Sequence, residues 1–430
     1  MLRAGVACLD ITPPLGTNLR GYFEERTATA VHDPLHVRAF ALEQGGEGIA
    51  VAICDIIAIN RAYLDRAKAR IAETTGLAPE RVLIACTHTH TGPVTGDDPY
   101  TDFLVGRIAD AVRLAWDRRE PAQAGWGRAE ERRVVFNRRY RMKDGTVQTN
   151  PGVGNPDVVE PAGPVDPEVG VLALRRPDRQ PLGLLANYAL HYVGIPDDWH
   201  AISADYFGFF AAMLPRLYGK PFLAALSNGA SGDINNIDVL GRTPTPNDHY
   251  QHVERVAGLI AAQAMWAANG ASYTDDCPVG GALAEVVLHR RPTPTEEDRA
   301  RAREIDARVA AGQPVLMGER SFANRVLRRW DSDDGPQEVP TWVQALRVGD
   351  LALVGVPGEF FVELGLAIKQ GSPFGQTMVL ELANDCVGYI PTRRAFEEGA
   401  YEPESSPYVP GFGEAIVDSA LDLLNRLHRA

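Results

Sequence analysis

Short apolar runs alternate along the chain with segments whose apolar residues recur every three or four positions. Helical spacing predicts helices at residues 61–75, 101–118, 206–217, 252–268, 295–311, 360–369 and 415–428. Apolar runs bounded by Gly, Pro or polar clusters predict strands at residues 6–11, 37–42, 49–54, 83–86, 169–175, 182–189, 222–226, 280–288, 341–348, 351–356 and 377–382. Alternation of strands and helices indicates an α/β fold, and we expect a mixed, partly parallel sheet flanked by helices. The sequence shows no internal repeat.

Two segments depart from this alternation. Residues 136–168 are rich in Arg, Asn, Gly and Pro, which predicts a long loop, and long loops in compact domains are usually functional or act as lids. Residues 292–340 contain an Ala-rich and charge-rich helical stretch with little apolar face, followed by an acidic loop. We expect this second segment to be a helical excursion on the surface of a single domain that spans residues 1–430.

Composition narrows the classes of function. A net charge of -13 leaves no excess of Lys and Arg for phosphates, which argues against nucleic-acid binding. No run of 18 apolar residues occurs, and the N-terminus lacks the apolar region of a signal peptide, so we expect a cytoplasmic protein without stable membrane association. The five widely spaced cysteines are typical of small buried hydrophobes. The oligomeric state is not indicated.

The sequence Leu83 to Pro93, LIACTHTHTGP, places two histidines directly after a buried strand. In extended backbone His88 and His90 point to the same face, where two imidazoles can bind a metal or share a proton-transfer site. The alternative is that they are polar residues that cap the strand by bonding to backbone. A His-x-His pair at this position favours the functional interpretation.

Polar side chains also follow other predicted strands. His191 ends the run at 182–189, and Glu359 follows the run at 351–356, where it could instead complement a helix dipole. The turn after 222–226 carries Asn228, Asp233 and Asn235 near one rim. It has neither the GxSxG spacing of a nucleophile elbow nor the pattern of a phosphate-binding loop.

The basic part of the 136–168 segment supplies candidate substrate contacts. Arg138 and Arg139 could bind an anionic or polyhydroxylated substrate, and the alternative is a solvated basic loop. Asp205 and Asn228 are further candidates for substrate binding because both lie close to strand ends that carry functional groups.

Several motifs together resemble one family, the neutral, non-lysosomal ceramidases, in their N-terminal catalytic domain. They are DITPP with Gly21-Tyr22, THTHTGP, NYALH, NGASGDINN, PGEF and ANDCVGYIPT, in this order along nearly the whole chain. The resemblance implies a zinc site formed by His88, His191, Glu359 and Tyr389, with His90 facing the substrate. Without the resemblance, Tyr389 would be taken as a core tyrosine.

Two features depart from the family pattern. The family turn reads GDxSPN and its serine is held to be catalytic, whereas Gly232-Asp233-Ile234 is followed here by Asn235-Asn236. The signal peptide and the C-terminal β-sandwich domain of secreted ceramidases are also not expected in this chain. Asn235 occupies the position of the family serine and is therefore a candidate catalytic residue.

The expected donor set suits zinc, because two imidazoles, a carboxylate and a phenol form a site of borderline softness. Zinc lowers the pKa of bound water towards roughly 7, so a serine is not needed. We expect His90 to act as acid/base, with Asp233 or Asp205 orienting it.

The predicted function is a zinc-dependent hydrolase of a small polar substrate, most simply one with an N-acyl amide bond, and one zinc ion per chain. The alternatives are a ceramidase-type lipid amidase, a metal-dependent hydrolase or lyase acting on an ester or glycoside, and a non-catalytic binding protein of the same fold.

Overall fold

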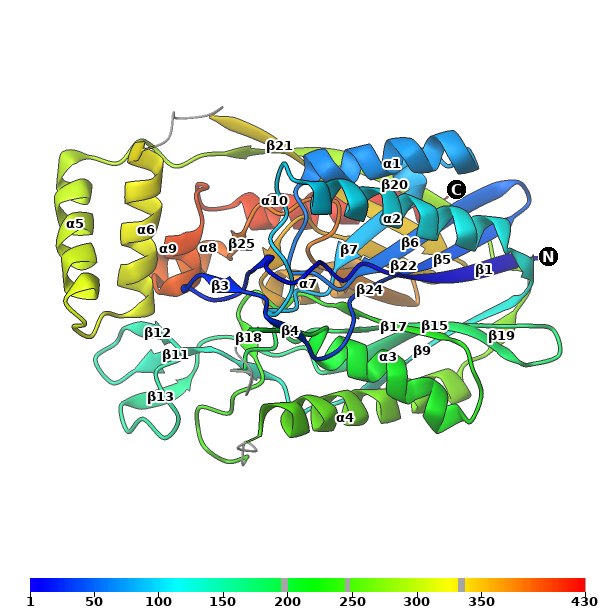
Figure 1. The fold of residues 1–430 in the computed structure, drawn as a ribbon, viewed down its shortest axis with the longest axis horizontal. Coiled ribbons are helices and arrows are strands. Elements are labelled where there is room, and N and C mark those ends of the chain that lie inside the picture. The colour runs from blue at the N-terminus through cyan, green and yellow to red at the C-terminus, as the bar shows by residue number, and fades with distance from the viewer. Residues whose placement is uncertain (195–199, 244–247, 332–336, 430) are drawn as a thin grey trace.

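Three β-sheets with helices on their outer faces form the body of the molecule (Figure 1). The computed structural model describes residues 1–194, 200–243, 248–331 and 337–429. The predicted α/β class with partly parallel pairing is confirmed, but the chain builds three separate sheets where the sequence predicted one.

The first sheet has the strand order β7-β6-β5-β1-β8, and only the β6–β7 pair is parallel. Helices α1 (Arg61–Thr75) and α2 (Pro99–Asp117) cover its outer face. Its strands are β1 (Arg3–Asp10), β5 (His36–Gln44), β6 (Glu47–Cys54), β7 (Val82–Cys86) and β8 (Glu120–Pro121), with a short 3₁₀ turn at Pro79–Arg81.

The second sheet has the order β17-β15-β14-β9-β19, with β15–β17 as its parallel pair. Helices α3 (Asp205–Tyr218) and α4 (His249–Gly270) pack on it. Its strands are β9 (Gln123–Glu130), β14 (Glu168–Arg175), β15 (Pro181–Tyr188), β17 (Leu223–Asn228) and β19 (Tyr273–Thr274).

The third sheet has the order β20-β21-β22-β24, with β22–β24 parallel. Helices α7 (Val362–Gly371) and α10 (Phe412–Arg429) cover it. Its strands are β20 (Val279–His289), β21 (Glu338–Val348), β22 (Leu351–Gly355) and β24 (Gln376–Leu380).

The three sheets share one plan. Each contains an antiparallel hairpin, then a helix, then a strand parallel to the second hairpin strand, then a second helix: β5-β6-α1-β7-α2, β14-β15-α3-β17-α4 and β21-β22-α7-β24-α10. The repetition is invisible in the sequence because the units share only apolar patterning, which many different residues satisfy.

The inner faces of the sheets meet in one central core. Phe40 and Leu83 from the first sheet, Leu172 and Leu185 from the second and Leu353 from the third belong to the same buried cluster. Helices bury the outer faces as well, and strands buried on both faces read as continuous apolar runs. This explains why the strand runs in the sequence lack polar alternation.

Short strand pairs close the end of the sheets at which β7, β15, β17, β22 and β24 finish. They are β2 (Asn18–Leu19) with β3 (Arg26–Thr27), β4 (Ala30–Val31) with β16 (Ala201–Ile202), β10 (Phe136–Asn137) with β18 (Ile234–Asn235), and β23 (Glu359–Phe360) with β25 (Tyr389–Ile390).

The segment 136–168 is not the continuous loop that its composition predicts. After β10 it forms β11 (Arg139–Met142), which pairs with β12 (Val147–Thr149) and β13 (Val158–Pro161). The prediction failed because the arginines in this segment bind buried carboxylates distant in sequence, and such partners cannot be recognised from local composition.

Between β20 and β21 the chain forms α5 (Glu296–Ala310) and α6 (Met317–Asp331), which lie together at one end of the molecule (Figure 1). Ile305, Phe322 and Val326 belong to a small core of their own. A capping box between Thr295 and Asp298 starts α5. The short helices α8 (Arg393–Glu398) and α9 (Tyr401–Ser405) lie next to this pair.

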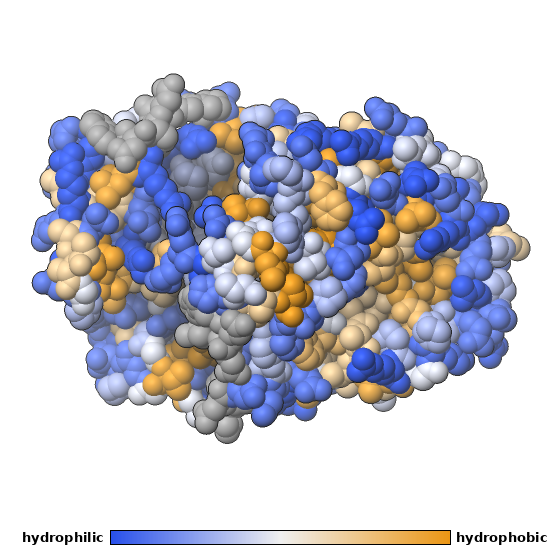
Figure 2. Space-filling model, viewed as in Figure 1, coloured by the Kyte–Doolittle hydropathy of each residue, from blue (hydrophilic) through white to orange (hydrophobic). Residues whose placement is uncertain are grey.

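The surface differs between the two ends of the molecule. Over α5 and α6 it is mostly hydrophilic, whereas apolar side chains gather between α2 and α3 (Figure 2). Near that apolar area Phe209, Met213 and Phe222 line a cavity of about 480 Å³ that contains none of the predicted site residues. Within the described ranges, no helix is both long and apolar enough to span a bilayer.

Replacing Gly5 by Ala should destabilise the fold. A Cβ at Gly5 would overlap the backbone carbonyl oxygen of Ala115, so β1 and α2 would have to move apart. Overpacking of this kind costs about 1–3 kcal/mol. Urea unfolding measures the loss, and Gly270→Ala is the control, because no atom lies within 4 Å of a Cβ built there. An equal effect of both changes would contradict this prediction.

Candidate metal centre

The predicted site residues come from the strand ends of all three sheets. His88 and His90 follow β7 of the first sheet, His191 follows β15 of the second, and Glu359 follows β22 of the third. Glu359 pairs in β23 with Tyr389 of β25. All five are buried or nearly so. The shared plan of the three sheets thus brings together residues that are up to 301 positions apart in the sequence.

His88 is held in one orientation. Its backbone has φ 66°, a left-handed conformation uncommon outside glycine, and strain of this kind clusters at functional sites. Its Nδ1 lies 3.0 Å from the carbonyl oxygen of Ile57, which can only accept, so Nδ1 carries the proton. The Nε2 lone pair is therefore free, as a metal-binding imidazole requires.

The three histidines form a compact cluster. Each offers a ring nitrogen within 4.8 Å of the others. The Nε2 atoms of His90 and His191 are 3.0 Å apart. No described residue forms a hydrogen bond with His88 Nε2 or His90 Nδ1, although both atoms are buried. Buried polar atoms normally have partners, so these two atoms indicate a missing one.

Glu359 completes the cluster with a carboxylate. Its Oε2 lies 3.4 Å from His88 Nε2 and 3.6 Å from His191 Nδ1, and among the described residues it has no hydrogen-bond donor. Tyr389 is paired with Glu359 in the β23–β25 ladder, and burial raises the pKa of its phenol well above 10. The sequence-predicted set of His88, His191, Glu359 and Tyr389 therefore meets at one point, with His90 beside it.

Burial and neighbouring charges shift the pKa values of the three histidines in different directions. Burial lowers the pKa of His90 and of His191 well below 6.5, and neighbouring positive groups lower it further, so both are neutral at pH 7. Burial also acts to lower the pKa of His88, but the Glu359 carboxylate outweighs it and the pKa is raised. Neutral imidazoles beside a carboxylate are the protonation states that zinc binding needs.

The residues present fit a metal ion such as zinc. The donors are nitrogen and oxygen atoms of the types zinc prefers, and three of them are buried without partners. Two overlapping sets are possible, because His191 presents Nε2 to His90 and Nδ1 to Glu359. A set through Nδ1 would replace the hydrogen bond that this atom accepts from Arg138. The geometry supports a metal site, and which set binds stays a prediction.

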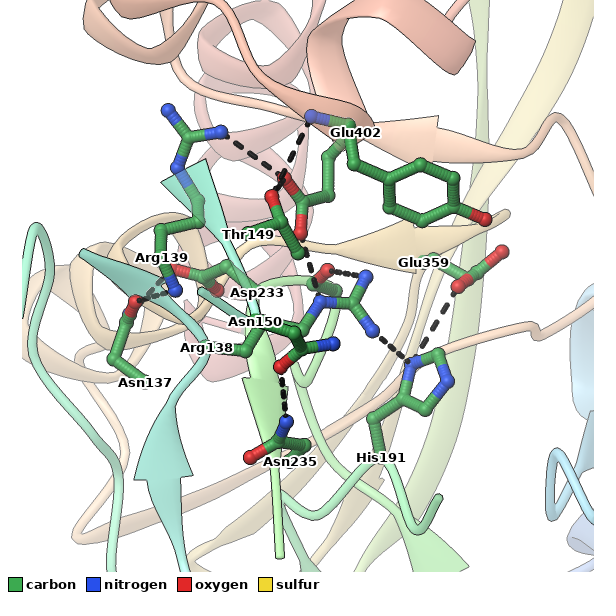
Figure 3. Close-up of polar contacts among 12 residues, drawn as sticks. Asn137, Arg138, Arg139, Thr149, Asn150, His191, Asp233, Asn235, Glu359 and Glu402 are labelled. Carbon is green, nitrogen blue, oxygen red and sulfur yellow. Dashed lines mark hydrogen bonds and ion pairs between the residues drawn. The ribbon is translucent and has the colours of Figure 1, made fainter. Parts of the chain in front are cut away.

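Arg138 and Arg139 lie inside the protein (Figure 3). Arg138 donates to Glu402 Oε1 at 2.8 Å and to the Gly232 carbonyl at 2.7 Å, and its third nitrogen is 3.3 Å from His191 Nδ1. Arg139 is ion-paired with Glu402 and Glu398, away from His191. The solvated basic loop is therefore wrong, and of the two arginines only Arg138 contacts the cluster.

The other predicted residues form hydrogen bonds with the segments that carry the site. Asp205 accepts hydrogen bonds from Thr89 Oγ1 and the His90 backbone, and burial raises its pKa to about 7. Asp233 accepts from Val362 N and Asn137 Nδ2, tying β10 to α7. Asn228 donates to Glu381. Of the two expected orienters, Asp205 thus touches the His-x-His segment, and the substrate contacts predicted for Arg139, Asp205 and Asn228 stay predictions.

Glu381 is a structural feature of the site that sequence patterns missed. Its buried carboxylate accepts hydrogen bonds from Asn228, from the Phe360 backbone and from both Ser231 N and Ser231 Oγ. Burial raises its pKa to about 8. It links the turn after β17 to the strand that carries Glu359. In the sequence, Glu381 is marked only by its position directly after a strand.

Tyr401 was also missed. Its ring lies 5.3 Å from that of Tyr389 in an edge-to-face contact, and the Arg138 guanidinium is 5.7 Å from its centroid. It begins the short helix α9, which has no recognisable amphipathic pattern.

Known proteins resemble this chain along nearly its whole length. No family model matches the chain. The neutral ceramidase of Pseudomonas aeruginosa is 24% identical to it across 99% of this chain and 72% of the relative, and that of Mycobacterium tuberculosis is 24% identical across 94% and 74%. The chain is thus similar to neutral ceramidases over nearly its whole length. The motif order in the sequence predicted this likeness, which the two relatives confirm.

Solved structures show the same fold. The crystal structure of the Pseudomonas aeruginosa neutral ceramidase superposes with a TM-score of 0.77 at 19% identity, over 100% of this chain and 74% of that one. A structure described as ceramidase complexed with C2 gives a TM-score of 0.76 at 19% identity, over 100% and 75%.

Measured against the neutral ceramidase pattern GDxSPN, the turn after β17 has Asn235 in place of the serine. Asn235 is fully buried, and its side chain donates to Asn150 Oδ1 at 2.6 Å. Ser231 lies four positions earlier in the same turn, and its hydroxyl donates to Glu381 Oε1 at 2.6 Å.

Replacing Glu402 by Gln should destabilise this neutral ceramidase homologue by about 3 kcal/mol or more, since losing one partner of a buried ion pair leaves charge uncompensated. Two buried guanidinium groups, those of Arg138 and Arg139, depend on its carboxylate. The control is Glu404→Gln in the same helix, whose carboxylate is 31% exposed and should contribute less than about 1 kcal/mol. Chemical denaturation measures both.

The Glu402 contribution should also depend on pH. Burial acts to raise the pKa of Glu402, but Arg138 and Arg139 outweigh it and the pKa falls below 4.5. A lowered pKa in the folded state means stabilisation that is present above pH 4.5 and is lost as pH falls through the folded-state value. Equal acid dependence in Glu402→Gln and the parent protein would contradict this assignment.

Proposed function

We propose that this protein is a zinc-dependent hydrolase that cleaves an amide bond in a small N-acyl substrate. The observation that carries the proposal is the buried cluster of His88, His90, His191 and Glu359, in which several polar atoms have no partner among the described residues. Similarity to two relatives that are both named neutral ceramidases supports the reaction class.

The chain's own residues have separable tasks in this proposal. Bound zinc would polarise the carbonyl and supply hydroxide at neutral pH. His90 is neutral at pH 7 and is placed to take up and return the proton, held by Asp205 through its backbone. Arg138 offers a fixed positive charge beside His191, which favours negative charge on a substrate oxygen.

A small polar substrate is supported by two observations. Asn235 replaces the family serine, which leaves water as the nucleophile. The surface around α5 and α6, at the end of the molecule where the site strands finish, is mostly hydrophilic (Figure 2). An enzyme that takes lipid from a membrane usually has an exposed apolar entrance.

The second candidate is a lipid amidase of the ceramidase type. It is favoured by the names of both relatives, each a neutral ceramidase. Both candidates use the same cluster and the same bond, and they differ in the length of the acyl chain that the site accepts.

The metal assignment predicts about one zinc ion per chain and a higher melting temperature when zinc is added to chelator-treated protein. His88→Ala and His191→Ala should lose the ion, because each removes a buried donor. His90→Ala should keep zinc and lose activity roughly a hundredfold if His90 is the acid/base. Elemental analysis gives the occupancy, and His289→Ala, an exposed histidine 60% accessible, is the control.

If untreated protein contains no transition metal and zinc leaves the melting temperature unchanged, the metal proposal fails. Loss of zinc in His90→Ala would instead assign the three-histidine set.

The substrate assignment predicts that kcat/KM does not rise as the acyl chain lengthens in a series from N-acetylethanolamine to N-palmitoylethanolamine. A polar entrance gains nothing from extra methylene groups, each worth about 0.8 kcal/mol when buried. Product amine released by each substrate gives the rates. Hydrolysis of long-chain ceramide in detergent micelles at roughly 10⁴ M⁻¹s⁻¹ or better would establish the lipid amidase instead.

A further inference from the structure

The amide orientation of Asn235 is determined by a backbone group. Ile237 N donates to Asn235 Oδ1 at 3.0 Å, and a backbone N–H cannot accept. The other end of this side chain is therefore Nδ2, which donates to Asn150 Oδ1 at 2.6 Å. The oxygen and nitrogen of an asparagine amide have nearly the same shape, so the hydrogen-bond partners determine which end is which.

The same reasoning determines how Asn150 is oriented. Because its Oδ1 accepts from Asn235, its Nδ2 is left as a donor. No described residue accepts a hydrogen bond from this nitrogen. The nitrogen is also not fully buried, so a ligand can reach it. Figure 3 shows it directed away from Asn235, on the side where Arg138 and His191 lie.

The backbone holds Asn150 in this place. Its φ of 50° is left-handed, a conformation that Asn tolerates better than most residues. Its N–H donates to the Arg138 carbonyl at 2.8 Å. The preceding Thr149 donates from Oγ1 to Glu402 Oε2 at 2.9 Å. The amide is thus anchored on both sides to the residues that position Arg138.

We propose that Asn150 is a substrate-binding residue whose Nδ2 donates to a neutral oxygen of the substrate, one group away from the scissile amide, and that Asn235 is the residue that positions it. The inference rests on the proposed amide hydrolysis and adds a selectivity to it. Arg138 already donates to Glu402 and Gly232, so Asn150 offers an uncommitted neutral donor beside it.

The donor selects by chemical class. An ether or hydroxyl oxygen can accept from Nδ2, whereas an ammonium group has only donors and would leave Nδ2 unpaired. A site built to hydrogen-bond one group discriminates strongly against a ligand that leaves its polar atoms unpaired.

Two isosteric variants should reverse this selectivity. In Asn235→Asp the Ile237 N–H still binds one carboxylate oxygen, and the other repels Asn150 Oδ1. Asn150 then rotates its amide, donates Nδ2 to position 235 and presents oxygen to the substrate. Asn150→Asp presents an oxygen directly and keeps a residue type that tolerates the left-handed backbone. Both changes replace the donor by an acceptor.

The test uses the full-length protein as purified and two hydrolysis-resistant probes, N-(2-methoxyethyl)butane-1-sulfonamide and N-(2-aminoethyl)butane-1-sulfonamide. Calorimetry should show that the parent protein binds the methoxy probe more tightly. Each variant should shift the affinity ratio at least tenfold towards the amino probe. Asn425→Asp, which adds the same charge on the exposed face of α10, should leave the ratio unchanged.

A purely structural role for either asparagine would weaken both probes equally, so an unchanged ratio in both folded variants overturns the proposal, as does failure of the parent protein to bind the methoxy probe. Either variant alone suffices if the other does not fold. A shifted ratio in a protein that hydrolyses none of the N-acyl compounds would support the Asn150 assignment and defeat the proposed function. Hydrolysis of an N-acyl compound together with an unchanged affinity ratio would support the proposed function and defeat the Asn150 assignment.

Discussion

Three sheets bury their inner faces in one core, and this constraint decides where every functional group lies. Each sheet contributes a parallel strand pair, and parallel strands end at the same edge. Because the core holds the sheets against one another, three such edges face a common point. His88, His191 and Glu359 reach that point from different sheets, so the site exists only when all three sheets are packed.

The local conformation and burial of the site residues cost free energy, and the surrounding hydrogen bonds hold these residues in place. It contains left-handed backbone at His88 and buried polar atoms without partners among the described residues. Three buried carboxylates accept hydrogen bonds from the groups around the site. Asp205 accepts from the His-x-His segment, Glu381 from the strand of Glu359, and Glu402 from Arg138. Such pre-organisation lets a buried cluster stay poised for a cation without rearranging.

At the position of the family serine, the turn after β17 carries a different residue while the fold persists. Asn235 keeps the turn after β17 in place through the Ile237 backbone and passes a hydrogen bond to Asn150. The hydroxyl is exchanged for a pair of amides, which cannot attack a carbonyl but can recognise oxygen. Metal donors on the other sheets are unaffected by this exchange, because they are anchored by different strands.

The sequence by itself predicted the class of fold, most strands and helices, the resemblance to neutral ceramidases and, through that resemblance, the histidines, carboxylate and tyrosine that lie together at the site. Apolar periodicity and motif order are local properties, and strand-end polar residues stand out against buried runs. Only the tertiary structure decided that three sheets repeat one plan, that residues 136–168 form strands, and that Arg138 and Arg139 are buried. It also revealed Glu381, Tyr401 and the Asn150–Asn235 pair. The buried arginines and the Asn150–Asn235 pair depend on contacts between residues 85 to more than 260 positions apart, and no local pattern encodes which partner a buried charge or amide will meet.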